Sequence, residues 1–113
     1  MSFVLSETDN THLYWHKVKI RKPIDNGFED HVIRVRYRAI TQDRVDQIAA
    51  TDPDQDLLLE LIQDWEQVND EAGNPVPYNA DNLRRLLGIT YVKAAIWMTY
   101  LETQAGGRAR RGN

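Results

Sequence analysis

Apolar and polar residues alternate in two segments of the first forty residues. In segment 13–21 one side of the alternation holds Tyr14, His16, Val18 and Ile20. In segment 32–38 the corresponding side holds Ile33, Val35 and Tyr37. A period of two predicts β-strands, and the intervening Asp25-Asn26-Gly27 offers residues that tolerate the left-handed backbone of a tight reversal. We therefore predict an antiparallel β-hairpin over residues 13–38.

The residues that follow show helical spacing. We predict four helices, over residues 41–50, 53–66, 80–87 and 90–104. The second helix is predicted from apolar residues at positions i, i+3, i+4 and i+7, namely Leu58, Leu61, Ile62 and Trp65. For the third helix, Asn79 is the expected N-cap and Gly88 the expected left-handed residue at the C-terminal end. The last helix is apolar on more than one side.

These elements predict an α+β fold with a single domain over residues 1–105. The hairpin forms a small sheet, whose apolar face packs on three or four helices. Residues 106–113 have no apolar side chain beyond Ala109 and carry three arginines, so we expect a flexible basic tail.

A stiff turn separates the second and third predicted helices. It contains Gly73, Pro75 and Pro77. Each proline fixes its own φ and favours an extended conformation in the residue before it. We therefore expect the chain to leave its helix at Trp65, cross a fixed elbow and become helical again after Asn79.

Charge is unevenly distributed along the 113 residues, whose net charge is −3. Residues 1–40 contain seven Lys or Arg and five Asp or Glu, whereas residues 41–105 contain four and twelve. A basic first part and an acidic middle suit contacts with partners or with further copies of the chain, although a solvated surface explains them equally well.

The residues that carry chemistry in enzymes do not form a recognisable pattern in this chain. Cysteine is absent, no Ser lies in a nucleophile-elbow motif, and no Gly-rich loop precedes a predicted helix. The three histidines, His12, His16 and His31, lack the spacing of metal ligands, and we expect His16 to be a half-buried histidine of the sheet. We predict no enzymatic activity, no cofactor and no metal site, and the apolar runs are too short for a membrane span.

Two surfaces are candidate partner-binding sites. The outer face of the hairpin groups six cations beside Trp15, namely Lys17, Lys19, Arg21, Arg34, Arg36 and Arg38. Such a face can be merely solvated, can bind an acidic protein, or can bind nucleic acid, although the acidic total argues against the last. The second candidate is the last helix, where apolar surface beyond one buried face would expose Trp97, Tyr100 and Leu101.

The second half of the chain also shows a family resemblance. It combines Asp64-Trp65-Glu66-Gln67-Val68, the turn Gly73-Asn74-Pro75-Val76-Pro77-Tyr78, a Leu-rich helix and a final helix ending in Ile96-Trp97-Met98-Thr99-Tyr100. Over about residues 55–102, this order resembles the tail assembly chaperones of long-tailed bacteriophages and prophages.

The resemblance implies a non-enzymatic protein of the host bacterial cytoplasm. Members of this family bind the long, largely helical and apolar tape measure protein during tail assembly, and the resemblance also implies self-association and contacts with other tail proteins. Many members are made in a short form and a frameshifted long form. A small structural virion component, such as a tail-completion or head-tail joining protein, stays open as an alternative. A nucleic-acid-binding module that uses the hairpin cations is a third possibility.

Overall fold

The predicted hairpin is confirmed and forms two strands of a three-stranded antiparallel sheet. The computed structural model describes residues 12–49 and 55–106. Strand β1 (Leu13–Ile24) pairs with β2 (Gly27–Arg38) along its whole length, and β2 then pairs with β3 (Ile62–Glu66), giving the order β1-β2-β3. Of the three residues expected to allow the reversal, Asn26 adopts the left-handed conformation, with φ of 61°.

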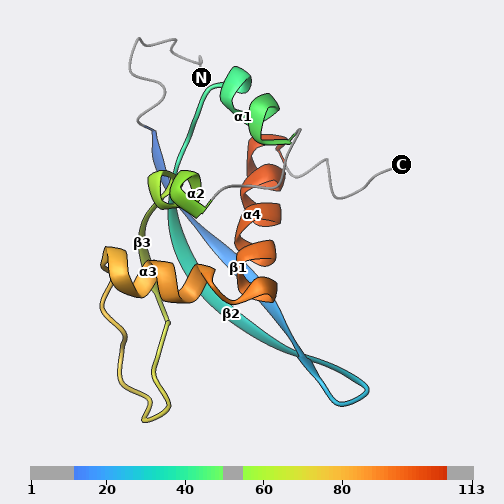
Figure 1. Cartoon of the computed structure of the whole chain (residues 1–113), viewed down its shortest axis with the longest axis vertical. Coiled ribbons are helices and arrows are strands. Elements are labelled where there is room, and N and C mark those ends of the chain that lie inside the picture. Colours follow the sequence, from blue (N-terminus) through green and yellow to red (C-terminus); the bar gives the residue numbers. More distant parts are fainter. Residues whose placement is uncertain (1–11, 50–54, 107–113) are drawn as a thin grey trace, which may run out of the picture.

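Four helices complete the α+β fold (Figure 1). They are α1 (Gln42–Ala49), α2 (Gln55–Leu61), α3 (Ala80–Leu87) and α4 (Thr90–Gln104). The Asn79 side chain caps α3 as predicted, because its oxygen accepts a hydrogen bond of 2.8 Å from the backbone N–H of Asn82. The expected left-handed end of α3 is wrong: Gly88 has φ of −71° and ψ of −13°, in the right-handed helical region.

The prediction of one helix over residues 53–66 is also wrong. Helix α2 ends at Leu61, and Ile62 begins β3. In β3, Asp64 pairs with Arg36 but Ile62 pairs with Tyr37, so Gln63 is an extra, bulged residue. The bulge lets residues 62 and 65 face the same side although they lie three apart, a spacing that a regular strand does not allow. This spacing is also helical, which explains the misprediction.

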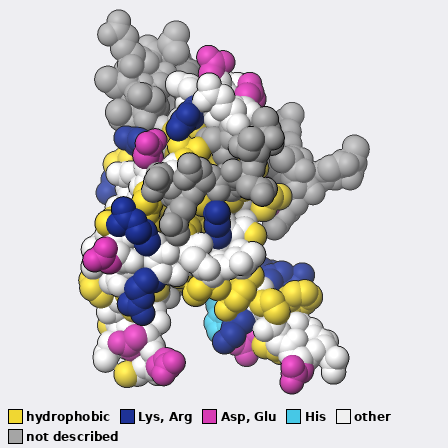
Figure 2. Space-filling model, in the orientation of Figure 1, with side chains coloured by type: hydrophobic (Ala, Val, Ile, Leu, Met, Phe, Trp, Pro, Cys, Tyr) yellow, Lys and Arg dark blue, Asp and Glu magenta, His cyan; other side chains and the backbone are white. Residues whose placement is uncertain are grey.

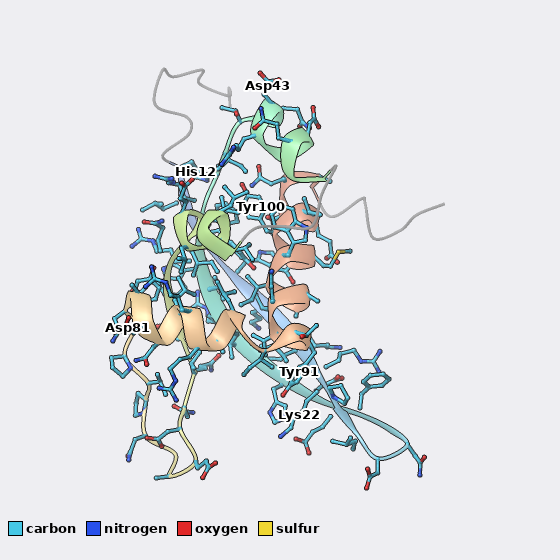
Figure 3. The ribbon with its side chains drawn as sticks, viewed as in Figure 1. His12, Lys22, Asp43, Asp81, Tyr91 and Tyr100 are labelled. Atoms are coloured by element: carbon cyan, nitrogen blue, oxygen red, sulfur yellow. The ribbon has the colours of Figure 1, made fainter. Side chains whose placement is uncertain are left out.

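The core lies between one face of the sheet and helices α2, α3 and α4. Its largest fully enclosed side chains are Tyr37 from β2 and Tyr100 from α4, and Figure 3 shows Tyr100 between α4 and the sheet. The Tyr37 hydroxyl donates a hydrogen bond of 2.8 Å to the backbone oxygen of Ile96. At the start of β1, the Tyr14 hydroxyl lies 2.7 Å from the Thr103 hydroxyl. These contacts fix α4 to the first two strands.

Two parts of the chain project beyond this core (Figures 1 and 2). One is the distal half of the hairpin, where the exposed apolar side chains include Ile24, Phe28 and Val32. The other is the segment 67–79 between β3 and α3, called the arm below. No helix in the described ranges is long and apolar enough to cross a membrane. The predicted tail, 106–113, lies outside the described residues except for Gly106.

Candidate functional site

The arm is a two-legged loop that is held against the sheet by Trp65. The Trp65 ring is 6% exposed, and its Nε1–H donates a hydrogen bond of 2.8 Å to the backbone oxygen of Val76. The ring also meets the Tyr78 ring edge to face, with 5.2 Å between centroids. The Tyr78 hydroxyl donates to the backbone oxygen of Ile62, and burial raises the pKa of Tyr78. The predicted elbow therefore exists, but it starts from a strand.

Backbone and carboxylate hydrogen bonds shape the tip of the arm. The two legs pair through the backbone N–H of Val76 and the backbone oxygen of Val68, 2.8 Å apart. At the tip, one carboxylate oxygen of Asp70 accepts hydrogen bonds from the backbone N–H groups of Ala72 and Asn74, at 2.9 and 3.0 Å. Gly73 supplies the left-handed conformation there, with φ of 84°. The arm thus has a defined shape.

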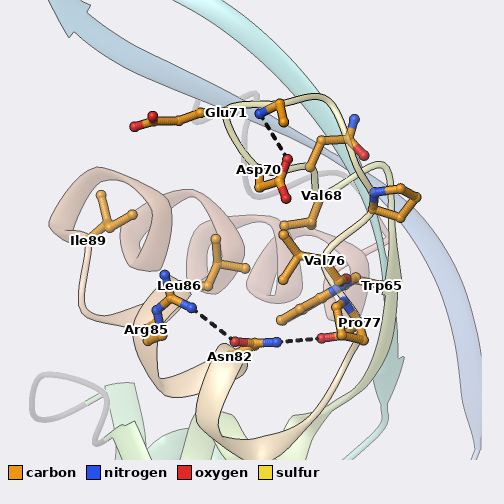
Figure 4. A pocket seen from close by; sticks show the side chains of 13 residues that line it. Trp65, Val68, Asp70, Glu71, Val76, Pro77, Asn82, Arg85, Leu86 and Ile89 are labelled. Atoms are coloured by element: carbon orange, nitrogen blue, oxygen red, sulfur yellow. Dashed lines mark hydrogen bonds between the residues drawn. The ribbon is translucent and has the colours of Figure 1, made fainter.

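An open groove of about 830 Å³ lies between the arm and the end of α3 (Figure 4). Its apolar lining includes Trp65, Val68, Val76, Leu86 and Ile89, and its polar lining includes Asp70, Glu71, Asn82 and Arg85. Asn82 links the two walls of the groove, since its side-chain N–H donates to the backbone oxygen of Pro77 at 2.9 Å. The Asn82 oxygen in turn accepts from Arg85 at 3.2 Å. An apolar floor with a charged rim suits a polypeptide with apolar side chains.

The expected exposure of Trp97 and Tyr100 on the last helix is wrong. Trp97 is 7% exposed and Tyr100 is fully enclosed, so neither side chain can meet a partner in this fold. The Tyr100 hydroxyl accepts a hydrogen bond of 3.1 Å from the backbone N–H of Ile40, and burial raises the Tyr100 pKa above its ordinary range. Leu101 is half-buried. On the opposite side of α4, Met98 is 56% exposed.

The cationic outer face exists, but three of its six cations lie within ion-pair distance of an acidic residue. Asp30 lies 3.8 Å from Lys19 and 3.4 Å from Arg21. Glu66 of β3 pairs with Arg34 at 2.7 Å. These contacts offset the repulsion between like charges on neighbouring strands.

Three of the six cations of this face, Lys17, Arg36 and Arg38, form no ion pair with a described residue.

The histidines are spread along the hairpin. His12 stacks on Tyr14 with 5.7 Å between ring centroids, and His31 lies 2.6 Å from a carboxylate oxygen of Glu29. The expected half-burial of His16 is wrong: it belongs to strand β1 at the edge of the sheet and is exposed. Within residues 12–49 and 55–106, no group of three or more His, Asp or Glu side chains is placed to hold a metal ion.

Two groups of residues were not predicted as parts of a site. Leu86 and Ile89 line the groove, and the only sequence signal for them is their position outside the stripe formed by the buried Leu83 and Leu87. Glu66, the partner of Arg34 on the outer face, was missed because it was assigned to a helix end.

Comparisons with protein-family models, curated proteins and solved structures find no match to this chain.

Proposed function

We propose that the protein is a tail assembly chaperone of a long-tailed bacteriophage or prophage, which binds the tape measure protein in the host bacterial cytoplasm without enzymatic activity. One observation carries the proposal. Part of the segment on which the family resemblance rests, including Trp65, Pro75 and Pro77, lines an open groove. A turn that served only to connect β3 to α3 would not need this tethered arm.

The chemistry of the groove supports a polypeptide client. Its floor offers the side chains of Val68, Val76 and Leu86, and Ile89 at its edge is 39% exposed. Burial of such side chains against an apolar partner releases water and gains roughly 25 cal/mol per Å². The charged side chains of Glu71 and Arg85 at the rim help to keep the protein soluble when no client is bound. A groove of this kind suits an apolar helix, the kind of client that the resemblance implies.

The groove replaces the last helix as the expected client surface. Trp97 and Tyr100 hold α4 in the core, so substitution of either would test folding instead of binding. Ile89→Glu and Met98→Glu are better probes, because both side chains are already exposed and only Ile89 lines the groove. Each substitution adds one negative charge to an exposed apolar position.

The experiment is co-purification with the tape measure protein of the same phage or prophage. We expect the wild type and Met98→Glu to retain the client and Ile89→Glu to lose it, with all three proteins equally helical by circular dichroism. Retention by Ile89→Glu together with loss in Met98→Glu would place the client on α4 instead. No retention by the wild type would reject the chaperone proposal.

Mass spectrometry of purified virions separates this function from that of a structural virion component. A tail assembly chaperone is absent from the finished particle, whereas a tail-completion or head-tail joining protein stays in it.

A further inference from the structure

The outer face of the sheet is a second surface, distinct from the groove. Helices α2, α3 and α4 contribute to the core on the opposite face, where Val18, Ile33 and Val35 are buried. On the outer face, β2 places Arg34, Arg36 and Arg38 at alternate positions of the central strand.

Two arginines that form no ion pair with a described residue lie side by side on this face. Arg36 is flanked by Trp15 of β1 and Asp64 of β3, and Arg38 lies opposite Leu13. The Asp64 carboxylate accepts a hydrogen bond of 2.8 Å from the backbone N–H of Trp65 and forms no ion pair with Arg36. The Arg36 and Arg38 guanidinium groups are therefore unpaired on a half-buried surface among the described residues.

The Nε–H groups of both arginines are buried and have no hydrogen-bond acceptor among the described residues. A buried donor without an acceptor is destabilising, and the effect is larger when the donor is charged. Carboxylates and phosphates both meet an arginine in a fork of two parallel hydrogen bonds. Because Nε is enclosed in both residues, the terminal nitrogens of each half-buried arginine are the donors that an incoming carboxylate would meet first.

We propose that this outer face binds an extended acidic segment of a partner protein, whose carboxylates pair with Arg36 and Arg38. The proposal goes beyond the chaperone function and does not depend on the groove. Arg36 and Arg38 are two residues apart on one strand, so their Cα atoms are about 6.5–7 Å apart. Carboxylates at alternate positions of an extended chain have the same spacing. Lys17, opposite Arg34 on the neighbouring strand, adds a third positive charge.

The charge pattern favours a protein over nucleic acid as the partner. Asp30, Asp64 and Glu66 share the outer face with the six cations. A continuous phosphate backbone would pass close to these acids, whereas a peptide can place its own carboxylates only where the arginines are.

Fluorescence anisotropy with a labelled peptide of alternating Glu and Ser residues tests the proposal at low ionic strength. We expect the full-length protein to bind this peptide and not a matched peptide with Gln in place of Glu. The double variant Arg36→Gln/Arg38→Gln should bind the Glu peptide on the order of tenfold or more weakly. It loses hydrogen bonds between charged groups, which are stronger than those between neutral groups. The control Arg44→Gln/Lys93→Gln removes the same charge from helices α1 and α4 and should bind like the wild type.

A charge exchange makes the test specific. The variant Arg36→Glu/Arg38→Glu should lose the Glu peptide and gain a peptide of alternating Lys and Ser residues, while circular dichroism confirms that it is folded. If Arg36→Gln/Arg38→Gln and Arg44→Gln/Lys93→Gln weaken peptide binding equally, the binding depends only on the total charge of the protein, and the proposal is overturned. Absence of binding to the Glu peptide would also overturn it.

Two further outcomes would assign the face to another occupant and overturn the proposal. One is tighter binding of a single-stranded oligothymidylate that Arg36→Gln/Arg38→Gln abolishes. The other is a wild-type oligomer that this variant converts to a monomer in sedimentation velocity.

Discussion

Replacement of Trp65 by Ala should be among the most destabilising changes in this protein. The indole is 6% exposed, joins the sheet to the arm through its hydrogen bond to Val76, and packs edge to face on Tyr78. Truncation of a buried Trp to Ala costs about 3–5 kcal/mol of unfolding free energy. The aromatic pair accounts for about 0.5–1.5 kcal/mol of stability in its own right. We therefore expect a loss of about 4 kcal/mol, a large part of the stability of a small domain.

Two further variants separate the causes of this loss. Trp65→Phe keeps most of the ring but removes the Nε1–H donor, and it should cost about 1–2 kcal/mol, because the Val76 oxygen lies beside the open groove and can bind water instead. Trp15→Ala removes the same side chain from the outer face, where it lies under the Arg34 guanidinium at 5.1 Å. A cation–π contact at such a site contributes about 0.5–1 kcal/mol, so the control should lose little more than that.

Urea unfolding followed by far-ultraviolet circular dichroism measures all three variants. Hydrogen exchange should in addition show faster exchange of the Val76 amide, which bonds to Val68 across the arm, in Trp65→Ala. A loss below about 1 kcal/mol in Trp65→Ala, or a loss equal to that of Trp15→Ala, would refute the packing described for the arm.

Three further predictions concern the core, the bulge and the tip of the arm. Burial raises the pKa of Tyr37 above its ordinary value of 10.0. Above about pH 10 the unfolded chain therefore loses a proton that the folded chain keeps. The free energy of unfolding should then fall by roughly 1.4 kcal/mol per pH unit because of this group. Tyr37→Phe should flatten that fall in alkaline urea titrations, and at neutral pH it should cost about 1–3 kcal/mol for the lost bond to Ile96. Deletion of Gln63 should remove the bulge and leave Ile62 two residues before Trp65, a spacing at which a regular strand keeps both side chains in the core, so it should lower the unfolding free energy by less than about 2 kcal/mol. A loss of about 2–5 kcal/mol, as if Ile62 had left the core, would contradict the bulge. Gly73→Ala should cost about 1–2 kcal/mol because φ is 84°, whereas Gly73→Asn should cost less, and equal thermal midpoints for the two variants would count against backbone strain.

The sequence predicts the hairpin well because its signals are local. Alternation over 13–21 and 32–38 defines the strands, and Asn26 allows the reversal between them. The N-cap of α3 is equally local, since the Asn79 side chain meets its own helix. Strand β3 could not be predicted in this way, because pairing with β2 and the bulge at Gln63 depend on residues far away in the sequence.

The candidate sites depend on packing that periodicity does not report. Helix α4 is apolar on two sides, and only contact with the sheet decides that Trp97 and Tyr100 are buried while Met98 is exposed. The groove forms because Trp65 binds the far leg of the arm. The pairing of Arg34 with Glu66 follows from β3, so the loss of β3 in the sequence prediction also hid the partial neutralisation of the outer face.

Site-specific photocrosslinking tests the groove as the client site most directly. A benzophenone amino acid at position 89 sits at the edge of the groove, and the same group at exposed position 43 in α1 is the control. In cells that make the tape measure protein, irradiation should link it to the protein labelled at position 89 and not to the protein labelled at position 43. Crosslinking from position 43 alone, or from neither position while the two proteins still co-purify, would contradict a client held in the groove.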